Sequence, residues 1–333
     1  MMKAIALVSG GLDSILAARI IKEQGIEVIP LHFKIPFCPR EKEKSPEKKS
    51  VSDLTADILG QKLRIIDISK DFLKLLESPM HGFGSQMNPC VDCKILMLGK
   101  AKDLMKGWDS SFIITGEVLG QRPMSQHKQA LQIIEKKSGL EGLVLRPLSA
   151  KLLSETIPEK QAQVDRNKLL RFSGRSRKPQ MALAKILNIK EYNQPAGGCL
   201  LTDPQFAKRL KDLIMHKELN LDNVELLKIG RHFRISAHAK LIVGRNEKEN
   251  EQLINLAKDK DYLFMPTDEI AGPTSLGRGI FNDVLVRASC SIACRYCDLN
   301  GRTEVDLIYC YRNKKEILRI SPLAEDSLKS LRI

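Results

Sequence analysis

The stretch that decides the fold is KAIALVSGGLDS, residues 3–14. Its apolar part, residues 3–8, predicts a buried strand, and the apolar pattern that resumes after the glycines predicts a helix through about Gln24. Further apolar strands are expected over 28–33 and 63–68. A strand, a loop, a helix and another strand in this order indicate a parallel sheet covered by helices. The predicted fold class is therefore α/β, with a parallel, Rossmann-like sheet.

The loop inside this stretch combines glycines with hydroxyl and carboxylate side chains. Glycines lack Cβ atoms and let backbone N–H groups approach phosphate oxygens, while the helix N-terminus supplies positive potential. The carboxylate of Asp13 suits a magnesium ion on the same phosphates. The closing Gly-Lys-Ser/Thr of a Walker loop is absent. The residues expected to bind a nucleotide's pyrophosphate are Ser9, Gly10, Gly11, Asp13 and Ser14.

The composition is that of a globular protein. Of 333 residues, 43% are hydrophobic and 28% are charged, which excludes a disordered chain. No apolar run approaches the roughly 20 residues that a membrane span needs, and the N-terminus carries no signal-peptide core. We therefore expect a cytoplasmic protein without a membrane partner. In a reducing cytosol, its eight cysteines favour metal binding or chemistry over disulfides.

The charge points to a polyanionic partner. The net charge is +14, and residues 151–190 supply half of it, with ten basic and three acidic residues. A solvated helix face usually mixes both signs, so this imbalance indicates a nucleic-acid surface. The residues expected to bind RNA are Arg171, Arg175, Arg177 and Lys178.

Three cysteines stand in two short motifs. Cys90 and Cys93, in the run NPCVDC, lie within one helical turn, and Pro89 fits the first turn of that helix. Cys199 follows two glycines, whose flexible backbone would let it approach the pair. The alternative is three unrelated thiols buried as small apolar residues.

These motifs resemble a known family. The SGGLDS loop is similar to that of the PP-loop ATP pyrophosphatases, which split ATP to AMP and pyrophosphate. Over roughly residues 1–205 the chain looks like a PP-loop tRNA thiouridine synthase and mixes features of two branches. Asn88-Pro89 with Cys93, and Gly198-Cys199, resemble the 2-thiouridine synthases. The runs TGEVLGQ from Thr115 and LRPL from Leu145 resemble the 4-thiouridine synthases.

The resemblance implies ATP-dependent thiolation of a tRNA uridine, whose carbonyl oxygen is adenylated before sulfur replaces it. It implies ATP, Mg²⁺, tRNA and a sulfur donor, either sulfide or a persulfide carrier protein. Some relatives use a cysteine persulfide and a second, resolving thiol. Others hold a [4Fe–4S] cluster by three thiolates. We favour the cluster because Cys90 makes a third ligand beside Cys93 and Cys199.

The same resemblance extends the nucleotide site. Gly116, Glu117 and Gln121 are expected beside the nucleotide at a strand end, where open α/β sheets bind ligands. Arg146 is interpreted as a structural residue. Two alternatives to tRNA thiolation stay open: sulfur insertion into a small molecule or cofactor precursor, and an RNA-binding module without catalysis.

The C-terminal part has a different character. We expect a thiolation domain over 1–205, a connector helix over 206–224 and an α+β domain over 225–333. The runs GRHF from Gly230 and KLIVGRN from Lys240 resemble the RNA-binding domain of ribosome quality-control factors. Residues 272–279 are expected to be flexible, basic backbone suited to phosphate contact. Cys290, Cys294, Cys297 and Cys310 are either a structural metal site or thiols that bind nothing.

The expected secondary structure follows from apolar periodicity and turn residues. A mobile loop is predicted over 40–50. Helices are expected over 51–59, 94–105, 159–172, 179–187, 204–215 and 247–257, and strands over 112–115, 232–236, 240–243 and 262–265.

Overall fold

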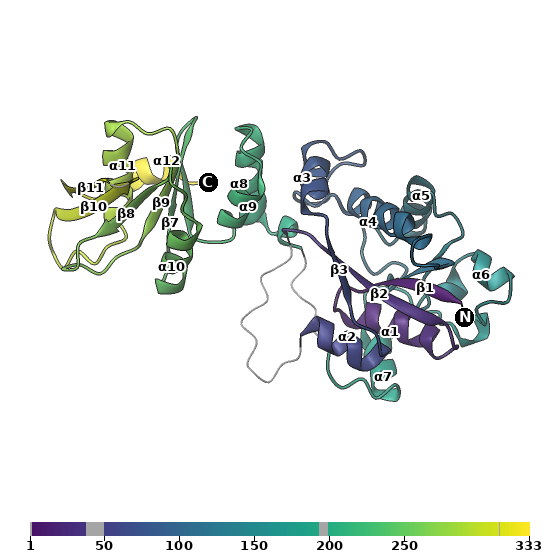
Figure 1. The fold of residues 1–333 in the computed structure, drawn as a ribbon. Helices are drawn as coiled ribbons and strands as arrows, with labels where there is room; N and C mark the ends of the chain where they lie inside the picture. The colour runs from purple at the N-terminus through teal and green to yellow at the C-terminus, as the bar shows by residue number, and fades with distance from the viewer. Residues whose placement is uncertain (1, 38–49, 193–198, 313) are drawn as a thin grey trace. The chain divides into compact units, whose positions relative to one another are not determined.

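The structure, a computed structural model, describes residues 2–37, 50–192, 199–312 and 314–333 (Figure 1). The chain forms two compact units, Met1–Thr202 and Asp203–Ile333. The loop predicted over 40–50 lies outside the described residues except for Ser50. Within the described part of the chain, every helix is too short or too polar to span a lipid bilayer.

The first unit is built on a five-stranded sheet in the order β3-β2-β1-β4-β5 (Figure 1). Every neighbouring pair is parallel, which confirms the predicted α/β class. The chain moves outward from β1 to β3 and then returns to place β4 on the other side of β1. Open parallel sheets bind ligands at such a switch point. The strands are β1 (Lys3–Leu7), β2 (Glu27–Lys34), β3 (Arg64–Asp67), β4 (Phe112–Thr115) and β5 (Val144–Leu145).

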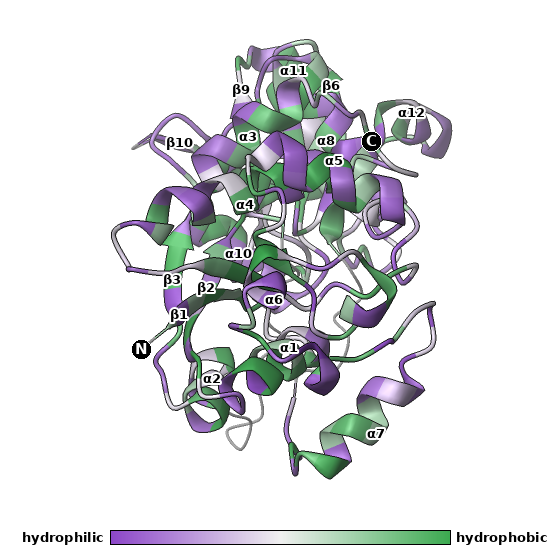
Figure 2. Ribbon diagram, turned by 90° about the vertical axis from the view of Figure 1, so that its right-hand side faces the viewer, coloured by the Kyte–Doolittle hydropathy of each residue, from purple (hydrophilic) through white to green (hydrophobic). Residues whose placement is uncertain are grey.

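Helices cover both faces of this sheet. Figure 1 shows α1, α2 and α7 on one face and α4 and α5 on the other, and the packing of α1 on α2 and α7 agrees. In Figure 2, α1 is mostly green because its sequence is largely apolar, as expected for a helix packed on a buried strand. The helices are α1 (Leu12–Lys22), α2 (Val51–Leu59), α3 (Ser69–Glu77), α4 (Cys90–Met105), α5 (Lys128–Ser138), α6 (Ile157–Lys160) and α7 (Lys178–Ile186).

The long helix predicted over 159–172 is wrong. The helix α6 ends at Lys160, and Ala162 adopts a left-handed backbone with φ of 56°. The Asp165 carboxylate then accepts a hydrogen bond from the backbone N–H of Asn167, which offers the backbone an alternative to helix. The segment continues as a short 3₁₀ turn, and Leu169 is buried in the core of the unit.

The second unit is an antiparallel sheet in the order β11-β10-β8-β9-β7-β6. One apolar cluster lies under α11 and α12, and another lies under α9 and α10. The strands are β6 (Arg231–Ser236), β7 (Ala239–Val243), β8 (Tyr262–Pro266), β9 (Ser275–Gly279), β10 (Val305–Tyr311) and β11 (Lys314–Ile320). The helices are α8 (Pro204–Met215), α9 (Leu221–Leu226), α10 (Glu247–Leu256), α11 (Asp283–Cys294) and α12 (Glu325–Leu331).

The flexible backbone expected over 272–279 is also wrong. Ser275–Gly279 is β9, which pairs with β7 and β8 inside the sheet. A Cβ on Gly277 would lie 2.6 Å from the Phe281 ring, so this glycine makes room for ring packing. Arg278 forms an ion pair with Asp261, which ties β9 to the start of β8.

Candidate nucleotide and thiol site

The glycine loop joins the end of β1 to the start of α1. Gly10 has φ of 80°, a conformation that favours glycine, and Gly11 caps the helix in an extended conformation. The Ser14 hydroxyl donates to the Gly11 carbonyl oxygen at 2.8 Å and accepts from the Ser9 N–H at 3.2 Å. The loop is therefore held in shape by its own side chains, with the positive end of an 11-residue helix behind it.

The end of β4 lies directly against this loop. A Cβ on Gly116 would come within 2.4 Å of the Ser14 backbone nitrogen and 2.5 Å of the Asp13 carbonyl carbon. Only glycine allows the two backbones to approach so closely. The structure therefore brings Gly116 to the nucleotide loop, as the sequence predicts.

Glu117, the next residue, forms the centre of a buried ion cluster. Its carboxylate accepts hydrogen bonds from Arg146 Nε and Thr115 Oγ1, both at 3.1 Å, and lies 3.5 Å from Lys94 Nζ. Burial alone would raise the pKa of Glu117, but the charges of Lys94 and Arg146 outweigh it and lower that pKa. Arg146 is buried and also contacts Glu135, consistent with a structural role. Lys94 is not among the site residues predicted from the sequence, although it stands one helical turn after Cys90.

Asp13 is shared by three parts of the chain. Its Oδ2 accepts a hydrogen bond from Gln121 Nε2 at 2.8 Å and lies 3.3 Å from Arg177 Nη2. Its Oδ1 is buried and has no hydrogen-bond partner among the described residues. A buried, partnerless carboxylate oxygen at a phosphate-binding loop fits a Mg²⁺ ligand.

The basic residues differ in exposure. Arg171, Arg175 and Lys178 are exposed, whereas Arg177 is half-buried and faces Asp13. Ser173 forms a parallel bridge with Leu119, beside Gln121. Three of the four residues expected to bind RNA are thus available to solvent.

Cys90 and Cys93 lie in the first turn of α4. Cys90 is its first residue, and Asn88 Nδ2 donates a hydrogen bond to Cys90 Sγ at 3.2 Å. The Cys93 N–H donates to the Pro89 carbonyl oxygen at 2.8 Å, so both cysteines stand at the helix N-terminus.

Cys199 lies on a neighbouring segment. The backbone N–H of Met87 donates to the Leu201 carbonyl oxygen at 3.1 Å, which joins the two cysteine-bearing segments. Cys199 Sγ donates to the Phe37 carbonyl oxygen at 3.5 Å, just beyond the end of β2. Residues 195–198 of its motif lie outside the described residues.

In the described residues, the side chains of Cys90, Cys93 and Cys199 are not gathered as ligands of one ion. Among the residues that the structure describes, no three His, Cys, Asp or Glu side chains gather closely enough to hold a metal. The iron–sulfur cluster at Cys90, Cys93 and Cys199 stays a prediction.

The cysteines of the second unit are mostly core residues. Cys290 and Cys294 are buried on α11, and Cys297 packs against the same apolar cluster. Burial raises the pKa of Cys290 to about 12 and that of Cys297 to about 11. Thiols in this state are inert and pack as small apolar groups.

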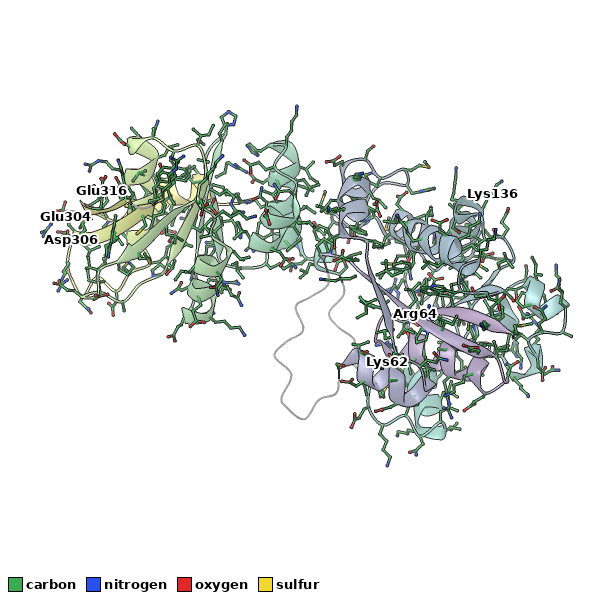
Figure 3. The ribbon with its side chains drawn as sticks, viewed as in Figure 1. Lys62, Arg64, Lys136, Glu304, Asp306 and Glu316 are labelled. Atoms are coloured by element: carbon green, nitrogen blue, oxygen red, sulfur yellow. The ribbon has the colours of Figure 1, made fainter. Side chains whose placement is uncertain are left out.

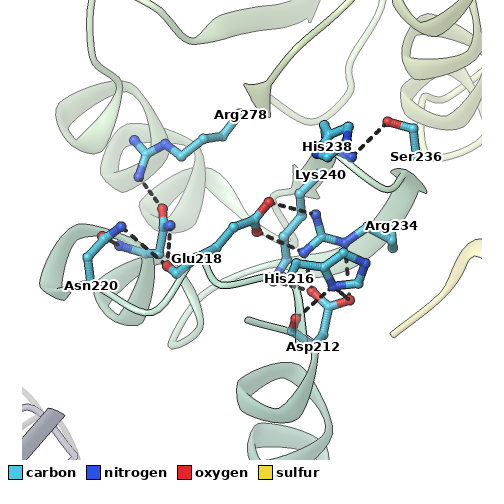
Figure 4. A network of polar contacts seen from close by, with 10 residues as sticks. Asp212, His216, Glu218, Asn220, Arg234, Ser236, His238, Lys240 and Arg278 are labelled. Carbon is cyan, nitrogen blue, oxygen red and sulfur yellow. Dashed lines mark hydrogen bonds and ion pairs between the residues drawn. The ribbon is translucent and has the colours of Figure 1, made fainter. Parts of the chain in front are cut away.

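A polar network joins α8 to the sheet of the second unit (Figure 4). Arg234 of β6 forms ion pairs with Asp212 of α8 and with Glu218, and Lys240 Nζ of β7 lies 3.4 Å from Asp212. Burial lowers the pKa of Lys240 to about 8. The side chain of Lys240 is only 6% exposed, so this amine is held in the interior by one carboxylate.

Each of the two units matches a different known family. Residues 1–157 match the family described as thiamine biosynthesis protein (ThiI). Residues 230–332 match the NFACT protein RNA binding domain.

Relatives of the first unit include tRNA-modifying proteins. A probable tRNA sulfurtransferase of Thermococcus kodakarensis is 30% identical over 146 residues, which are 44% of this chain and 36% of the relative. The tRNA-specific 2-thiouridylase MnmA of Petrotoga mobilis is 32% identical over 130 residues, 35% of each chain. The chain thus spans about a third of the length of these relatives.

A solved 4-thiouridine synthetase–RNA complex with bound ATP shares 18% identity, with a TM-score of 0.37, over 68% of this chain and 52% of its own. The expected resemblances are confirmed by the family matches and the curated relatives. The first unit resembles PP-loop tRNA thiouridine synthases of both branches, and residues 230–332 resemble the RNA binding domain of NFACT proteins.

Proposed function

We propose that the protein is an ATP-dependent enzyme that replaces a uridine carbonyl oxygen of tRNA with sulfur. One observation carries this proposal: a chain of contacts from the glycine loop reaches Lys94 on α4, the helix that begins with Cys90 and Cys93. The loop at Ser14 touches Gly116, and Glu117 follows Gly116 and pairs with Lys94. Lys94 and Cys90 are four residues apart on α4, so they share a helix face about 6 Å apart along the axis.

The nucleotide end of this chain of contacts would bind ATP. The backbone of Gly10 and Gly11 and the hydroxyls of Ser9 and Ser14 would donate to the phosphates, and Asp13 would hold Mg²⁺. The uridine oxygen attacks the α-phosphorus, pyrophosphate leaves, and the uridine carries AMP on that oxygen. The ion would neutralise charge that develops on the leaving pyrophosphate.

The thiol end would deliver sulfur. In the persulfide alternative to the cluster, one of Cys90, Cys93 and Cys199 carries a persulfide loaded by a sulfur donor, and its terminal sulfur attacks the activated carbon and displaces AMP. A second thiolate then attacks the protein sulfur of this adduct. Thiouridine is released, a disulfide forms, and an external thiol must reduce it before the next turnover. The backbone hydrogen bond from the Met87 N–H to the Leu201 carbonyl oxygen supports this scheme because it holds the two cysteine-bearing segments together.

RNA would be bound by exposed basic side chains of the first unit and by the second unit. Arg171, Arg175 and Lys178 are exposed, and the last two flank Arg177, which contacts Asp13 of the glycine loop. Glu304, Asp306 and Glu316 gather at one end of the second unit (Figure 3). Glu304 lies 3.4 Å from Arg319 Nε, and Asp306 stands opposite Arg319 in the β10–β11 pair, so this end carries charges of both signs and does not repel RNA as a whole.

The test uses the full chain, purified without oxygen. It is incubated with ATP, Mg²⁺, a tRNA transcript and either sulfide or a persulfide donor. The expected results are pyrophosphate release that depends on RNA, and a thiolated nucleoside in the digest by mass spectrometry. Iron content and the visible spectrum distinguish the cluster from the persulfide.

Matched cysteine variants sharpen this test. Each cysteine that takes part in sulfur transfer should lower thiolation by about 100-fold or more when it is replaced by alanine. The variants are Cys90→Ala, Cys93→Ala and Cys199→Ala. Cys310→Ala, in the second unit, is expected to leave thiolation unchanged. Pyrophosphate release that is the same with and without RNA would be hydrolysis of ATP and would count against RNA as the acceptor. If no donor yields a thiolated nucleoside, the proposed function is wrong.

A further inference from the structure

Arg177 lies where the nucleotide loop meets the basic segment, defined here as residues 171–178. We propose that Arg177 is a ligand of the ATP pyrophosphate rather than of RNA. This inference rests on the proposed use of ATP and RNA by the same unit.

The basic segment is docked on the nucleotide loop at several points. The Gly174 N–H donates to the Leu119 carbonyl oxygen at 2.8 Å, and Ser173 forms a bridge with Leu119. Further on, Gln180 Nε2 donates to Gln121 Oε1 at 3.2 Å, and Gln121 in turn donates to Asp13. Arg177 lies between these contacts, so its position is fixed from both sides.

The helix that follows Arg177 is firmly held. The helix α7 starts at Lys178 and packs on α1, and its Ala184 belongs to the core cluster of the first unit. Gln180 is fully buried. Arg177 therefore stands at the start of an anchored helix, and its guanidinium is presented to the loop by rigid structure.

The guanidinium itself is incompletely satisfied. Its Nη2 lies 3.3 Å from Asp13 Oδ2, a long contact for a charged pair. Its Nε is buried and has no hydrogen-bond partner among the described residues. A buried donor without a partner costs free energy, and a phosphate can accept from two nitrogens of one guanidinium. The geometry therefore leaves a donor ready for a phosphate oxygen beside a loop shaped for phosphates.

The remaining basic side chains of the segment do not share this environment. Arg175 and Lys178 flank Arg177 in sequence and are exposed to solvent. When ATP with Mg²⁺ occupies the loop, Arg177 exchanges its contact with Asp13 for the pyrophosphate, and Asp13 is released to the metal.

The test compares two arginines two residues apart in the full chain. Arg177→Ala, Arg177→Lys and Arg175→Ala are titrated by calorimetry with α,β-methylene ATP, with and without Mg²⁺. The same variants are titrated with tRNA by fluorescence anisotropy over a range of salt. Circular dichroism checks that each variant is folded, and Arg177→Lys keeps the test open if Arg177→Ala is not.

Arg177→Ala should weaken nucleotide binding about tenfold or more, both with and without Mg²⁺, because a charged contact to phosphate is lost. Arg177→Lys should recover part of the loss. In Arg175→Ala, nucleotide affinity should stay within about twofold, while tRNA binding weakens and its salt slope falls by about one.

Two results would overturn the inference. Nucleotide binding in Arg177→Ala that equals or exceeds that of the parent would mean that Arg177 only restrains Asp13. A loss of tRNA affinity and salt slope equal to that of Arg175→Ala, with nucleotide binding intact, would make Arg177 an RNA ligand. Neither titration measures thiolation, so an inactive enzyme would refute the proposed function without deciding the role of Arg177.

Discussion

Gly116→Ala tests whether the end of β4 sets the shape of the nucleotide loop. The added Cβ would lie 2.4 Å from the Ser14 nitrogen and 2.5 Å from the Asp13 carbonyl carbon. Both are backbone atoms, so no side chain can rotate away. Non-bonded heavy atoms settle at about 3.5 Å, so β4 and the loop must separate by about 1 Å.

The consequence differs for stability and for function. Overpacking of this kind costs about 1–3 kcal/mol of unfolding free energy, or about 2–12 °C of Tm for a unit of this size. A displacement of about 1 Å at a phosphate site can lower turnover about 100-fold. We therefore expect function to suffer far more than stability.

The assay is calorimetric titration with α,β-methylene ATP and Mg²⁺, followed by thermal unfolding monitored by circular dichroism. The matched control is Gly99→Ala on α4, where a new Cβ would meet no atom within 4 Å. Gly99→Ala should therefore bind nucleotide normally. Because alanine in a helix interior is favoured over glycine by about 0.5–1 kcal/mol, this variant should also unfold at a slightly higher temperature. Undiminished nucleotide affinity in Gly116→Ala would refute the claim that β4 positions the loop.

Three further substitutions or treatments probe buried charges and thiols. Glu117→Gln leaves Arg146 without its buried carboxylate and should cost about 3–5 kcal/mol at pH 7. Because the pKa of Glu117 lies below its ordinary 4.5, this contribution is present above that pH and fades below it, so denaturant titrations of parent and variant should converge in acid. The pKa of Lys240 is about 8 in the folded protein and about 10.5 in the unfolded chain, so the free energy of unfolding should rise between these two pH values. Lys240→Met should abolish that rise. Cys290 should resist iodoacetamide at pH 8 until the protein is unfolded, as mass spectrometry can show; rapid labelling of the native protein would contradict its burial.

Much of the first unit is readable from the sequence because its strands are continuous apolar runs. The strand expected over 63–68 is β3, which is shorter and runs from Arg64 to Asp67, and the strand expected over 112–115 is β4, with the predicted bounds. The helix expected over 204–215 is also confirmed, because Asp203 caps it by accepting from the Phe206 N–H at 2.7 Å. Local signals of this kind need no knowledge of distant residues.

The failures share a different cause. Residues 159–172 carry a helical apolar pattern, but their apolar side chains fill the core from an irregular segment held by Asp165. Residues 275–279 look like flexible glycine-rich backbone, yet they form a sheet strand whose Gly277 accommodates Phe281. In both cases tertiary packing overrides local propensity.

The candidate site shows the same division. The turn at Ser9–Ser14 is readable because two glycines and flanking serines between a strand and a helix favour a tight loop, while its binding of phosphate stays a prediction. The pairing of Arg177 with Asp13 joins residues 164 positions apart, and single-sequence charge counting assigned Arg177 to the RNA surface. Gln180 offers no signal in the sequence, because its role depends on meeting Gln121.

The polar network under α8 decides where the chain can be divided. A fragment that begins after α8 would leave Arg234 and Lys240 without the Asp212 carboxylate and would uncover the apolar groups around Leu213. A fragment of residues 203–333 keeps these contacts. We expect the longer fragment to melt cooperatively in a calorimeter and the shorter one to aggregate. A helix that the sequence suggests as a connector thus acts as part of the second folding unit.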